Sequence, residues 1–270
     1  MALATFKGGI HPPDKKDIAK DRAIKEAKSP QRVVIPLSQH LGAPCKPIVS
    51  IGQEVKKGEV IGEPGGFVSA PVHSSVSGKV IAIAEFPNAM GRMINSIVIE
   101  NDGKEEWTSL KDNPDYIKLS PDELKEKVKA AGIVGMGGAA FPTLVKLSPP
   151  KEKPIDTVIL NGAECEPYLT ADYRLMIEKS AEIVEGLKIL MRILGVNKGF
   201  IGIENNKPDA IEAMKQAASK VRSSELGVQS IEVCGLEVKY PQGAEKMLIS
   251  ALTGREVPPR ALPMDVRVVV

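Results

Sequence analysis

The sequence predicts an α/β protein in two parts: a small β domain made of a barrel of short strands, and an α/β domain with a mainly parallel sheet. Two observations support this prediction. Residues 33–100 alternate short β-branched runs with glycine and proline, whereas residues 120–270 alternate strand-like and helix-like segments. A third feature, the glycine-rich stretch 135–146, opens the second part and offers bare backbone to a ligand.

The composition is that of a globular protein and argues against several functions. Hydrophobic residues make up 43% and charged residues 26% of the 270 residues, and the net charge of +2 gives no reason to expect a nucleic-acid partner. Aromatic residues reach only 4%, which is few for a base-stacking surface. No run of about 20 apolar residues occurs, so we expect no direct membrane span.

Cysteine and histidine are too dispersed to suggest a metal site. The three cysteines, Cys45, Cys165 and Cys234, lie far apart and form no Cys-x-x-Cys pair. We therefore expect no disulfide framework, no zinc site and no iron–sulfur cluster within this chain. A reducing compartment such as the cytoplasm is the simplest setting for such a chain.

Residues 1–32 are predicted to form a mostly extended N-terminal arm, because two glycines, a Pro-Pro pair and a lysine-rich polar run follow one another. Residues 33–100 then form the barrel domain. Its strands are expected at the β-branched runs 33–36, 48–51, 60–61, 67–68, 80–83 and 94–99.

The barrel region resembles a known family of domains. The valine and glycine spacing of residues 49–62, followed by Gly78-Lys79-Val80, is similar to the biotinyl/lipoyl barrel-sandwich domains. Carrier members of that family hold a lysine at a hairpin tip. The matching tip, residues 63–68, has no lysine, so the resemblance implies a structural or docking module that carries no lipoate or biotin.

Residues 101–119 are a polar connector, and we place the domain boundary there. A helix is predicted to begin after Ser120, because Ser120, Pro121 and Glu123 form the pattern of a capping box with proline in the first turn. Gly132 ends this helix, and the glycine-rich stretch follows it.

The rest of residues 120–270 alternates strands and helices in the order typical of a parallel sheet. Strands are predicted at 157–160, 199–203, 230–233 and 266–270, and helices at 171–194, 208–221 and 243–252. Ligands of such sheets bind at the carboxyl ends of the strands. Residues 161–166 leave one such end, and the glycine-rich stretch could meet them there.

Three segments carry side chains that could build a site. Gly135–Lys146 offers backbone amides, an aromatic ring and a cation. Asn161–Tyr168 offers an amide and two carboxylates, and Tyr240–Lys246 offers a tyrosine, a glutamine and a glutamate at a helix N-terminus. No Ser-His-Asp set, histidine pair or Walker lysine motif accompanies them. These groups suit a ribityl chain, a phosphate and stacked rings.

The same segments resemble those of a flavoprotein family. Gly135–Lys146, with the sequence G-M-G-G-A-A-F-P-T-L-V-K, is similar to the G-x-G-G-x-G-F-P-T-x-x-K motif of the flavin-bearing subunit of respiratory complex I. Asn161–Pro167 is similar to the N-A-D-E-x-E-P motif of that subunit. The RnfC component of Rnf electron-transport complexes is more similar still, over the whole chain, including residues 7–13 and 240–246.

This resemblance implies an NADH-oxidising, FMN-binding electron-input module of an Rnf-type complex, which couples electron transfer between NADH and ferredoxin to ion translocation. The residues implied to hold FMN are Gly135, Gly137, Gly138, Lys146, Asn161 and Glu164. The residues implied to contact NADH are Phe141, Glu166, Tyr240 and Glu245. No catalytic acid or base is assigned, because the flavin carries the hydride chemistry.

The resemblance also implies a location and partners. We expect a peripheral protein at the cytoplasmic face of the membrane, with the other subunits of a membrane electron-transport complex as partners. The family continues with a flavin loop and with cysteine-rich segments that hold [4Fe-4S] clusters. We therefore expect a chain that ends at Val270 to be a fragment, inactive alone and incomplete as an FMN site.

Three positions depart from the complex I motifs, since Met136, Ala163 and Ala244 stand where that family has polar residues. Each change removes a polar contact, so FMN would be held more weakly or in a different pose. The same residues are expected of the Rnf relatives.

Alternatives stay open on the sequence alone. The chain could be a non-catalytic docking or scaffold protein, or part of a related flavoprotein cobalamin reductase. Gly135–Gly138 could form only a tight turn, and Lys146 could be a solvated surface residue. Glu164 and Glu166 could cap the helix that follows them, and Tyr240 could be a packing residue.

Overall fold

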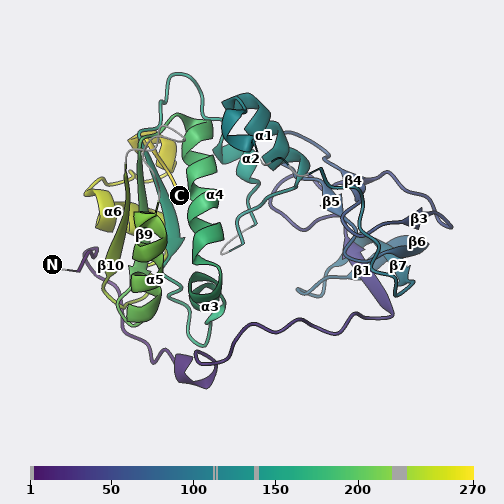
Figure 1. Cartoon of the computed structure of the whole chain (residues 1–270), viewed down its shortest axis with the longest axis horizontal. Helices are drawn as coiled ribbons and strands as arrows, with labels where there is room; N and C mark the ends of the chain where they lie inside the picture. Colours follow the sequence, from purple (N-terminus) through teal and green to yellow (C-terminus); the bar gives the residue numbers. More distant parts are fainter. Residues whose placement is uncertain (1–2, 112, 114, 137–139, 221–229) are drawn as a thin grey trace. The chain divides into compact units, whose positions relative to one another are not determined.

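The computed structural model describes all residues except 1–2, 112, 114, 137–139 and 221–229. Its contacts divide the chain into two compact units (Figure 1). We call Glu26–Ser148 the barrel unit, and Met1–Lys25 together with Pro149–Val270 the sheet unit. These two units are defined by contacts and have other limits than the domains predicted with boundaries after residues 32, 100 and 119. The domain boundaries themselves stay a prediction.

The barrel unit contains two small antiparallel sheets. The first has the order β1 (Arg32–Pro36), β7 (Met93–Asn101), β6 (Gly78–Pro87) and β3 (Glu54–Val55). The second consists of β2 (Lys46–Pro47), β4 (Val60–Glu63) and β5 (Val72–His73). Both contribute to one aliphatic core, which includes Ile35, Leu37, Val55, Ile61, Val72, Val80, Ile97 and Ile99.

Two of the predicted barrel strands are wrong. Residues 48–51 lie outside any strand, because the chain turns at Gly52, which has a φ of +91°. Residues 67–68 form a bend after Gly65 and Gly66, and the Phe67 side chain is exposed. The other four predicted runs lie in β1, β4, β6 and β7.

The helix predicted after Ser120 is confirmed as α1 (Pro121–Ala130). The Ser120 hydroxyl accepts a hydrogen bond from the Glu123 amide, and the Glu123 carboxylate accepts one from the Ser120 amide. These reciprocal bonds satisfy two amides that have no partner within the helix. Two shorter helices of this unit are η2 (Tyr116–Lys118) and α2 (Thr143–Lys146).

The sheet unit is built on a parallel sheet with the strand order β10–β9–β8–β11. Its strands are β8 (Thr157–Gly162), β9 (Lys198–Glu204), β10 (Ser230–Leu236) and β11 (Val268–Val269). Its helices are η1 (Lys16–Ile18), α3 (Ala171–Glu178), α4 (Ser180–Leu194), α5 (Pro208–Ser219), α6 (Glu245–Thr253) and η3 (Pro263–Val266). The predicted fold class, antiparallel β followed by α/β with a parallel sheet, is therefore confirmed.

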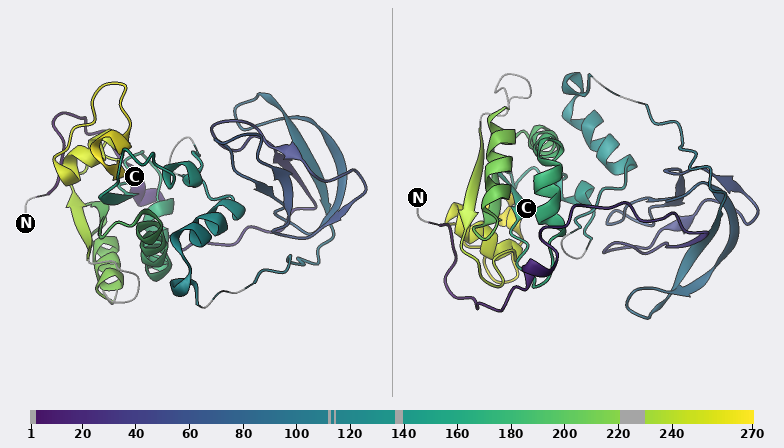
Figure 2. Two further views of the ribbon diagram at one scale, coloured as in Figure 1. Left: turned by 90° about the horizontal axis from the view of Figure 1, so that it is seen from above. Right: turned by 60° about the horizontal axis from the view of Figure 1, so that its bottom comes forward.

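Helices cover both faces of the parallel sheet. A side chain at Gly199 in β9 would meet Met191 and Leu187 of α4, whereas one at Gly202 would meet Leu248 and Leu252 of α6. Side chains three residues apart on a strand point to opposite faces. In Figure 2, α6 (yellow) accordingly lies on one side of the sheet and the green helices α4 and α5 on the other. Burial on both faces explains why β9 is almost entirely apolar and buried.

The single helix predicted over 171–194 is wrong, because the chain breaks it at Lys179. That residue has φ −134° and ψ 28°, outside the helical region, so α3 and α4 run in different directions. The break lets α3 pack on α5, where the Tyr173 hydroxyl donates to the Asp209 carboxylate at 2.6 Å. Neither proline nor glycine marks the break, so the hydrophobic periodicity could not reveal it.

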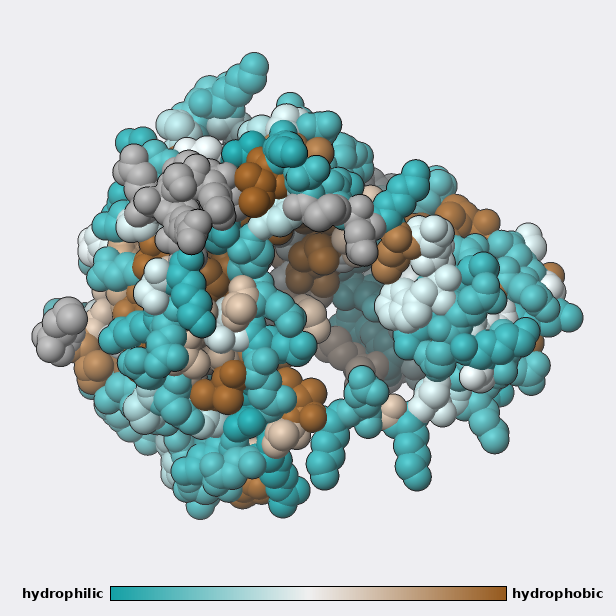
Figure 3. Space-filling view, viewed as in Figure 1, coloured by the Kyte–Doolittle hydropathy of each residue, from teal (hydrophilic) through white to brown (hydrophobic). Residues whose placement is uncertain are grey.

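No helix in the part of the chain that the structure describes is long and apolar enough to cross a membrane. The surface in Figure 3 is mainly hydrophilic, with apolar side chains scattered over it. Exposed apolar side chains such as Phe67, Met90 and Trp107 are individually normal for a protein surface.

The packing around β9 yields a stability prediction. A methyl group at Gly202 would lie 3.0 to 3.1 Å from Leu236, Leu248 and Leu252, so Gly202→Ala should lower the free energy of unfolding. We expect a loss of about 1–3 kcal/mol, as for other overpacked cores. Gly186 in α4 is exposed and has no neighbour within 4 Å of such a methyl group. Gly186→Ala should therefore raise the free energy of unfolding by about 1 kcal/mol. Urea unfolding measures both variants, and equal changes in the free energy of unfolding would contradict the packing described for Gly202.

Candidate functional site

Asn161 lies at the carboxyl end of β8 and ties two segments of the sheet unit together. Its Nδ2 donates to the Gly243 carbonyl at 2.8 Å, and its Oδ1 accepts from the Ala163 amide at 3.2 Å. The side chain is exposed, and a primary amide has a second hydrogen and a second lone pair to offer. Asn161 thus has hydrogen-bonding capacity left for a ligand at this edge.

Glu164 follows in the loop between β8 and α3, residues 163–170, which we call the strand-exit loop. One carboxylate oxygen of Glu164 accepts from the Asp172 amide in the first turn of α3 at 2.7 Å. Glu164 thus bonds to the first turn of α3, although the N-cap residue of that helix is Thr170. Its other oxygen, Oε2, is buried and has no hydrogen-bond partner within the described part of the chain. An acceptor in that position requires a donor from solvent or from a ligand.

Glu166 and Tyr240 meet at the same edge. The Tyr240 hydroxyl donates to the Glu166 carboxylate, and this bond raises the pKa of Tyr240 above its ordinary value of 10.0. The tyrosine therefore stays protonated at neutral pH. Between them, the Cys165 sulfur accepts from the Gly243 amide at 3.4 Å, and burial raises the pKa of the Cys165 thiol. The thiol is a packing group in this environment.

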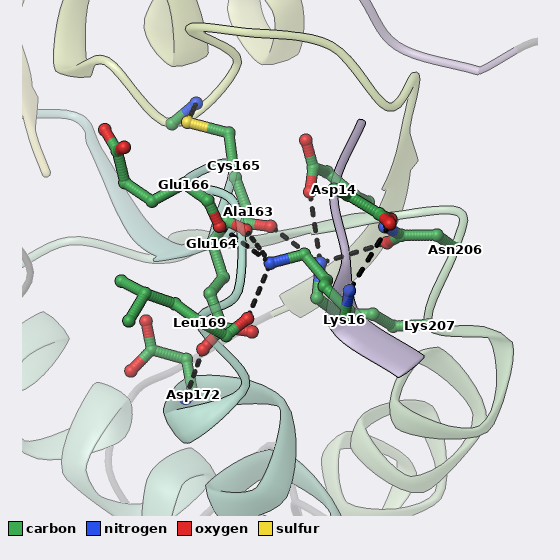
Figure 4. Close-up of polar contacts among 12 residues, drawn as sticks. Asp14, Lys16, Ala163, Glu164, Cys165, Glu166, Leu169, Asp172, Asn206 and Lys207 are labelled. Atoms are coloured by element: carbon green, nitrogen blue, oxygen red, sulfur yellow. Dashed lines mark hydrogen bonds and ion pairs between the residues drawn. The ribbon is translucent and has the colours of Figure 1, made fainter. Parts of the chain in front are cut away.

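Two buried lysines hold the strand-exit loop (Figure 4). The Lys16 ammonium donates to the carbonyls of Glu164, Glu166 and Leu169 at 2.9, 3.0 and 2.6 Å. The Lys207 ammonium donates to the Ala163 carbonyl at 2.9 Å and pairs with Glu204 at 3.1 Å. Lys16 is 6% exposed and Lys207 is 2% exposed, so both charges are almost wholly removed from water.

Burial dominates the electrostatics of this cluster. It lowers the pKa of Lys16, with a further contribution from the neighbouring Lys207 charge. It raises the pKa values of Glu164, Asp172 and Glu204. Each group is driven towards its neutral form because a charge is poorly solvated there. Close cation–carboxylate neighbours offset part of this effect.

Gln242 is a second unsatisfied group in this region. Its side chain is fully buried, and neither its amide nitrogen nor its amide oxygen has a hydrogen-bond partner in the described chain. The next residue, Gly243, approaches the segment after β8 closely, since a methyl group there would lie 3.3 Å from both Ala163 and Cys165. Glu245 then begins α6. The segment 240–245 thus brings polar groups to the edge that also holds Asn161.

The glycine-rich stretch belongs to the barrel unit, where it closes on itself. The Gly135 amide donates to the Phe141 carbonyl at 2.9 Å, and Val134 bridges to Pro142. Lys146 is the last residue of α2. Gly137 and Gly138 lie outside the described residues. The structure therefore brings Asn161, Glu164, Glu166 and Tyr240 together, whereas their relation to Gly135, Phe141 and Lys146 remains a prediction.

The two lysines that support the loop were not predicted from the sequence. Lys207 had a usable signal, because it follows the predicted strand 199–203 at the same sheet edge as residues 161–166. Lys16 had none, since it lies in a polar lysine-rich run 150 residues away from Glu166. Across the residues described, no cluster of three or more histidine, cysteine or acidic side chains is placed to hold a metal ion.

These units define a class of protein: a barrel of antiparallel strands joined to a parallel α/β sheet whose carboxyl edge carries unsatisfied polar groups. Residues 128–270 match the family described as the Nuo51 FMN-binding domain, and residues 4–104 match the RnfC barrel sandwich hybrid domain. The chain therefore belongs to the Nuo51 FMN-binding domain family and carries an RnfC barrel sandwich domain before it. The predicted resemblance to the RnfC component of Rnf complexes is confirmed.

Curated relatives are similar to nearly the whole chain. The C subunit of the Na(+)-translocating ferredoxin:NAD(+) oxidoreductase complex from Acetobacterium woodii is 53% identical over 268 residues, which are 98% of this chain and 59% of that protein. The C subunit of the proton-translocating ferredoxin:NAD(+) oxidoreductase complex from Clostridium ljungdahlii is 51% identical, covering 99% of this chain and 57% of that protein. The chain thus spans somewhat more than half the length of these relatives.

The sheet-unit residues fit a flavin nucleotide. The ribityl chain of FMN carries hydroxyl groups, which need acceptors, and the buried Glu164 Oε2 is an acceptor without a protein partner among the residues described. Asn161 retains one donor and one acceptor for a ligand.

The raised pKa of Glu164 predicts how stability depends on pH. The folded protein holds this proton more tightly than the unfolded chain, whose carboxyl titrates near 4.5. The free energy of unfolding of the wild type, relative to Glu164→Gln, should therefore fall as pH rises from 4.5 through the raised pKa, and then level off. Urea unfolding across this range measures it, with exposed Glu152→Gln as the control. A relative stability that rises with pH would contradict the burial argument.

Proposed function

We propose that this chain is the FMN-binding, NADH-oxidising part of an Rnf-type membrane complex that transfers electrons between NADH and ferredoxin. One observation carries the proposal: Glu164, in the loop that leaves the carboxyl end of β8, has a buried carboxylate oxygen without a hydrogen-bond partner in the described part of the chain. Open α/β sheets bind their ligands at this edge. Membership of a family described by FMN binding supports the same assignment.

Each residue has a physical role in this proposal. Asn161 and Glu164 would hydrogen-bond the ribityl hydroxyls, with Glu164 held in place by the amide of Asp172. The Tyr240 and Glu166 pair would contact NADH, and Glu245 would add a carboxylate at the start of α6. By the resemblance, Gly135, Gly137 and Gly138 would be among the FMN contacts. Lys146 would neutralise the phosphate, and Phe141 would stack on NADH.

The chemistry that a bound flavin supplies is acceptance of a hydride and release of single electrons. The protein then has to bind, orient and exclude water. No residue at this edge needs to act as a general acid or base, and the raised pKa values of Tyr240 and Cys165 keep both groups protonated. The side chains named above therefore act as positioning and binding groups.

The complex and its location form a further part of the proposal. The similar proteins named above are subunits of ion-translocating complexes. By this similarity we propose the other subunits of such a complex as partners, with this chain placed peripherally at the cytoplasmic face of the membrane. Electrons would leave towards [4Fe-4S] clusters held by segments of the relatives that this chain does not span.

Flavin binding tests the proposal. The purified chain, or the same chain extended to the length of its relatives, should quench the fluorescence of FMN, and NADH added without oxygen should bleach the bound flavin. If neither form quenches FMN, the flavin assignment is wrong and a docking or scaffold role takes its place. If FMN binds but NADH does not bleach it, the electron donor is a different one.

The glycine-rich stretch offers a variant that separates folding from binding. Among the described residues, a methyl group at Gly135 would meet only Phe141 backbone atoms at 3.8 and 4.0 Å, which are ordinary contacts. Gly135→Ala should therefore leave the thermal midpoint unchanged while weakening FMN binding about tenfold, because the backbone could no longer approach the cofactor. Gly186→Ala is the matched control and should bind as the wild type. Unchanged affinity in Gly135→Ala would exclude close approach at this position.

A further inference from the structure

The first residues of the chain are an integral part of the sheet unit. Ala4 pairs in parallel with Leu236 at the end of β10, and Ile10 pairs with Tyr240 through two backbone hydrogen bonds of 2.9 and 2.8 Å. The chain then reaches η1, and Figure 1 shows this purple segment running along the sheet unit from its N-terminus to η1. The first third of the predicted extended arm is therefore fastened, at Ala4 and Ile10, to the segment that carries Tyr240.

Lys16, in η1, is where this arm reaches the strand-exit loop. Its ammonium has three N–H donors, and all three have a carbonyl acceptor within 3.0 Å, on Glu164, Glu166 and Leu169. Asp14, two residues earlier, adds a fourth link, because its carbonyl accepts from the Tyr168 amide at 2.7 Å. Figure 4 shows the Lys16 ammonium pointing towards the carbonyls of Glu164, Glu166 and Leu169.

The loop depends on these bonds because its own conformation is costly. Glu164 and Tyr168 have φ values of +51° and +68°, a left-handed region that residues with side chains seldom adopt. Carbonyls of such a loop cannot pair with a neighbouring strand or helix turn. These hydrogen bonds are partly buried, and a carbonyl left there without a donor would cost up to about 1–3 kcal/mol. One lysine therefore provides the donors that make this loop shape stable.

Two of the three carbonyls that Lys16 holds belong to Glu164 and Glu166, whose side chains are the proposed ligand contacts. A shift of either backbone would carry its carboxylate away from the amide of Asp172 or from Tyr240. The three hydrogen bonds of the Lys16 ammonium all go to backbone carbonyls. Its influence on a ligand would pass through the loop.

We propose that Lys16 is a positioning residue of the cofactor site: the N-terminal arm inserts one buried cation beneath the strand-exit loop and so fixes the carboxylates of Glu164 and Glu166. This inference rests on the proposed function for the identity of the ligand. The loop's dependence on Lys16 rests on the geometry alone.

The test compares Lys16→Met with Lys15→Met. Methionine keeps an unbranched chain but removes the charge and the three donors, whereas Lys15 is exposed and adjacent. Amide hydrogen exchange without any ligand should accelerate about tenfold or more in residues 163–170 of Lys16→Met, because the loop loses about 1.4 kcal/mol or more of local stability. The Tyr168 amide is the most direct reporter. Exchange in β9 should not change, and Lys15→Met should behave as the wild type.

Affinity then separates positioning from a purely structural role. FMN should bind about tenfold more weakly to Lys16→Met than to the wild type, with no loss in Lys15→Met. If the loop loosens but FMN binds equally well, or if loop exchange is unchanged, the positioning role is overturned. If the loop loosens but the wild type does not bind FMN either, the proposed function fails while the arm's hold on the loop stands.

A conservative variant keeps the test decisive if Lys16→Met does not fold. Lys16→Arg retains the charge and several donors, but a planar guanidinium cannot direct three bonds from one nitrogen. Lys16→Arg should fold. Its loop amides should exchange about threefold or more faster than in the wild type, and FMN should bind to it about threefold or more weakly. Wild-type values for both in Lys16→Arg would overturn the requirement for a lysine at this position.

Discussion

Four backbone carbonyls of the strand-exit loop accept hydrogen bonds from two buried lysines, and the arrangement of the sheet edge depends on this interaction. The loop turns through left-handed conformations that leave its carbonyls without partners in regular structure. Lys16 and Lys207 supply the donors from two different segments. Because removing either partner would leave buried polar groups unpaired, this small network is costly to break.

The rest of the sheet unit makes that network possible. Helices on both faces bury β8 and β9, so polar groups collect where the strands end. The same burial raises the pKa of Glu164 and leaves its Oε2 without a donor among the described residues. Two features thus prepare this edge for a ligand. The two lysines hold the backbone of the strand-exit loop, and the Glu164 carboxylate has an oxygen that can accept a hydrogen bond from a ligand hydroxyl group.

The sequence was sufficient for the parts of the fold with local signals. Periodicity placed β8 and β9, and a capping box placed the start of α1. Features that depend on distant partners were out of reach. The break at Lys179 lacks proline or glycine, and the isoleucines near Gly52 have strand composition but turn geometry. Motifs predicted Asn161 and Glu164 as site residues, which stays a prediction, whereas Lys16 became visible only once the fold had brought the arm to the loop.

In the proposed FMN site, the loop held by Lys16 and Lys207 forms one wall. A crystal structure of the protein soaked with FMN tests this most directly. We expect FMN at the carboxyl edge of β8, with Asn161 and Glu164 Oε2 within hydrogen-bonding distance of its ribityl chain and Lys16 still bonded to the loop carbonyls. FMN bound elsewhere, or bound at this edge with the strand-exit loop rearranged and Lys16 displaced, would contradict it.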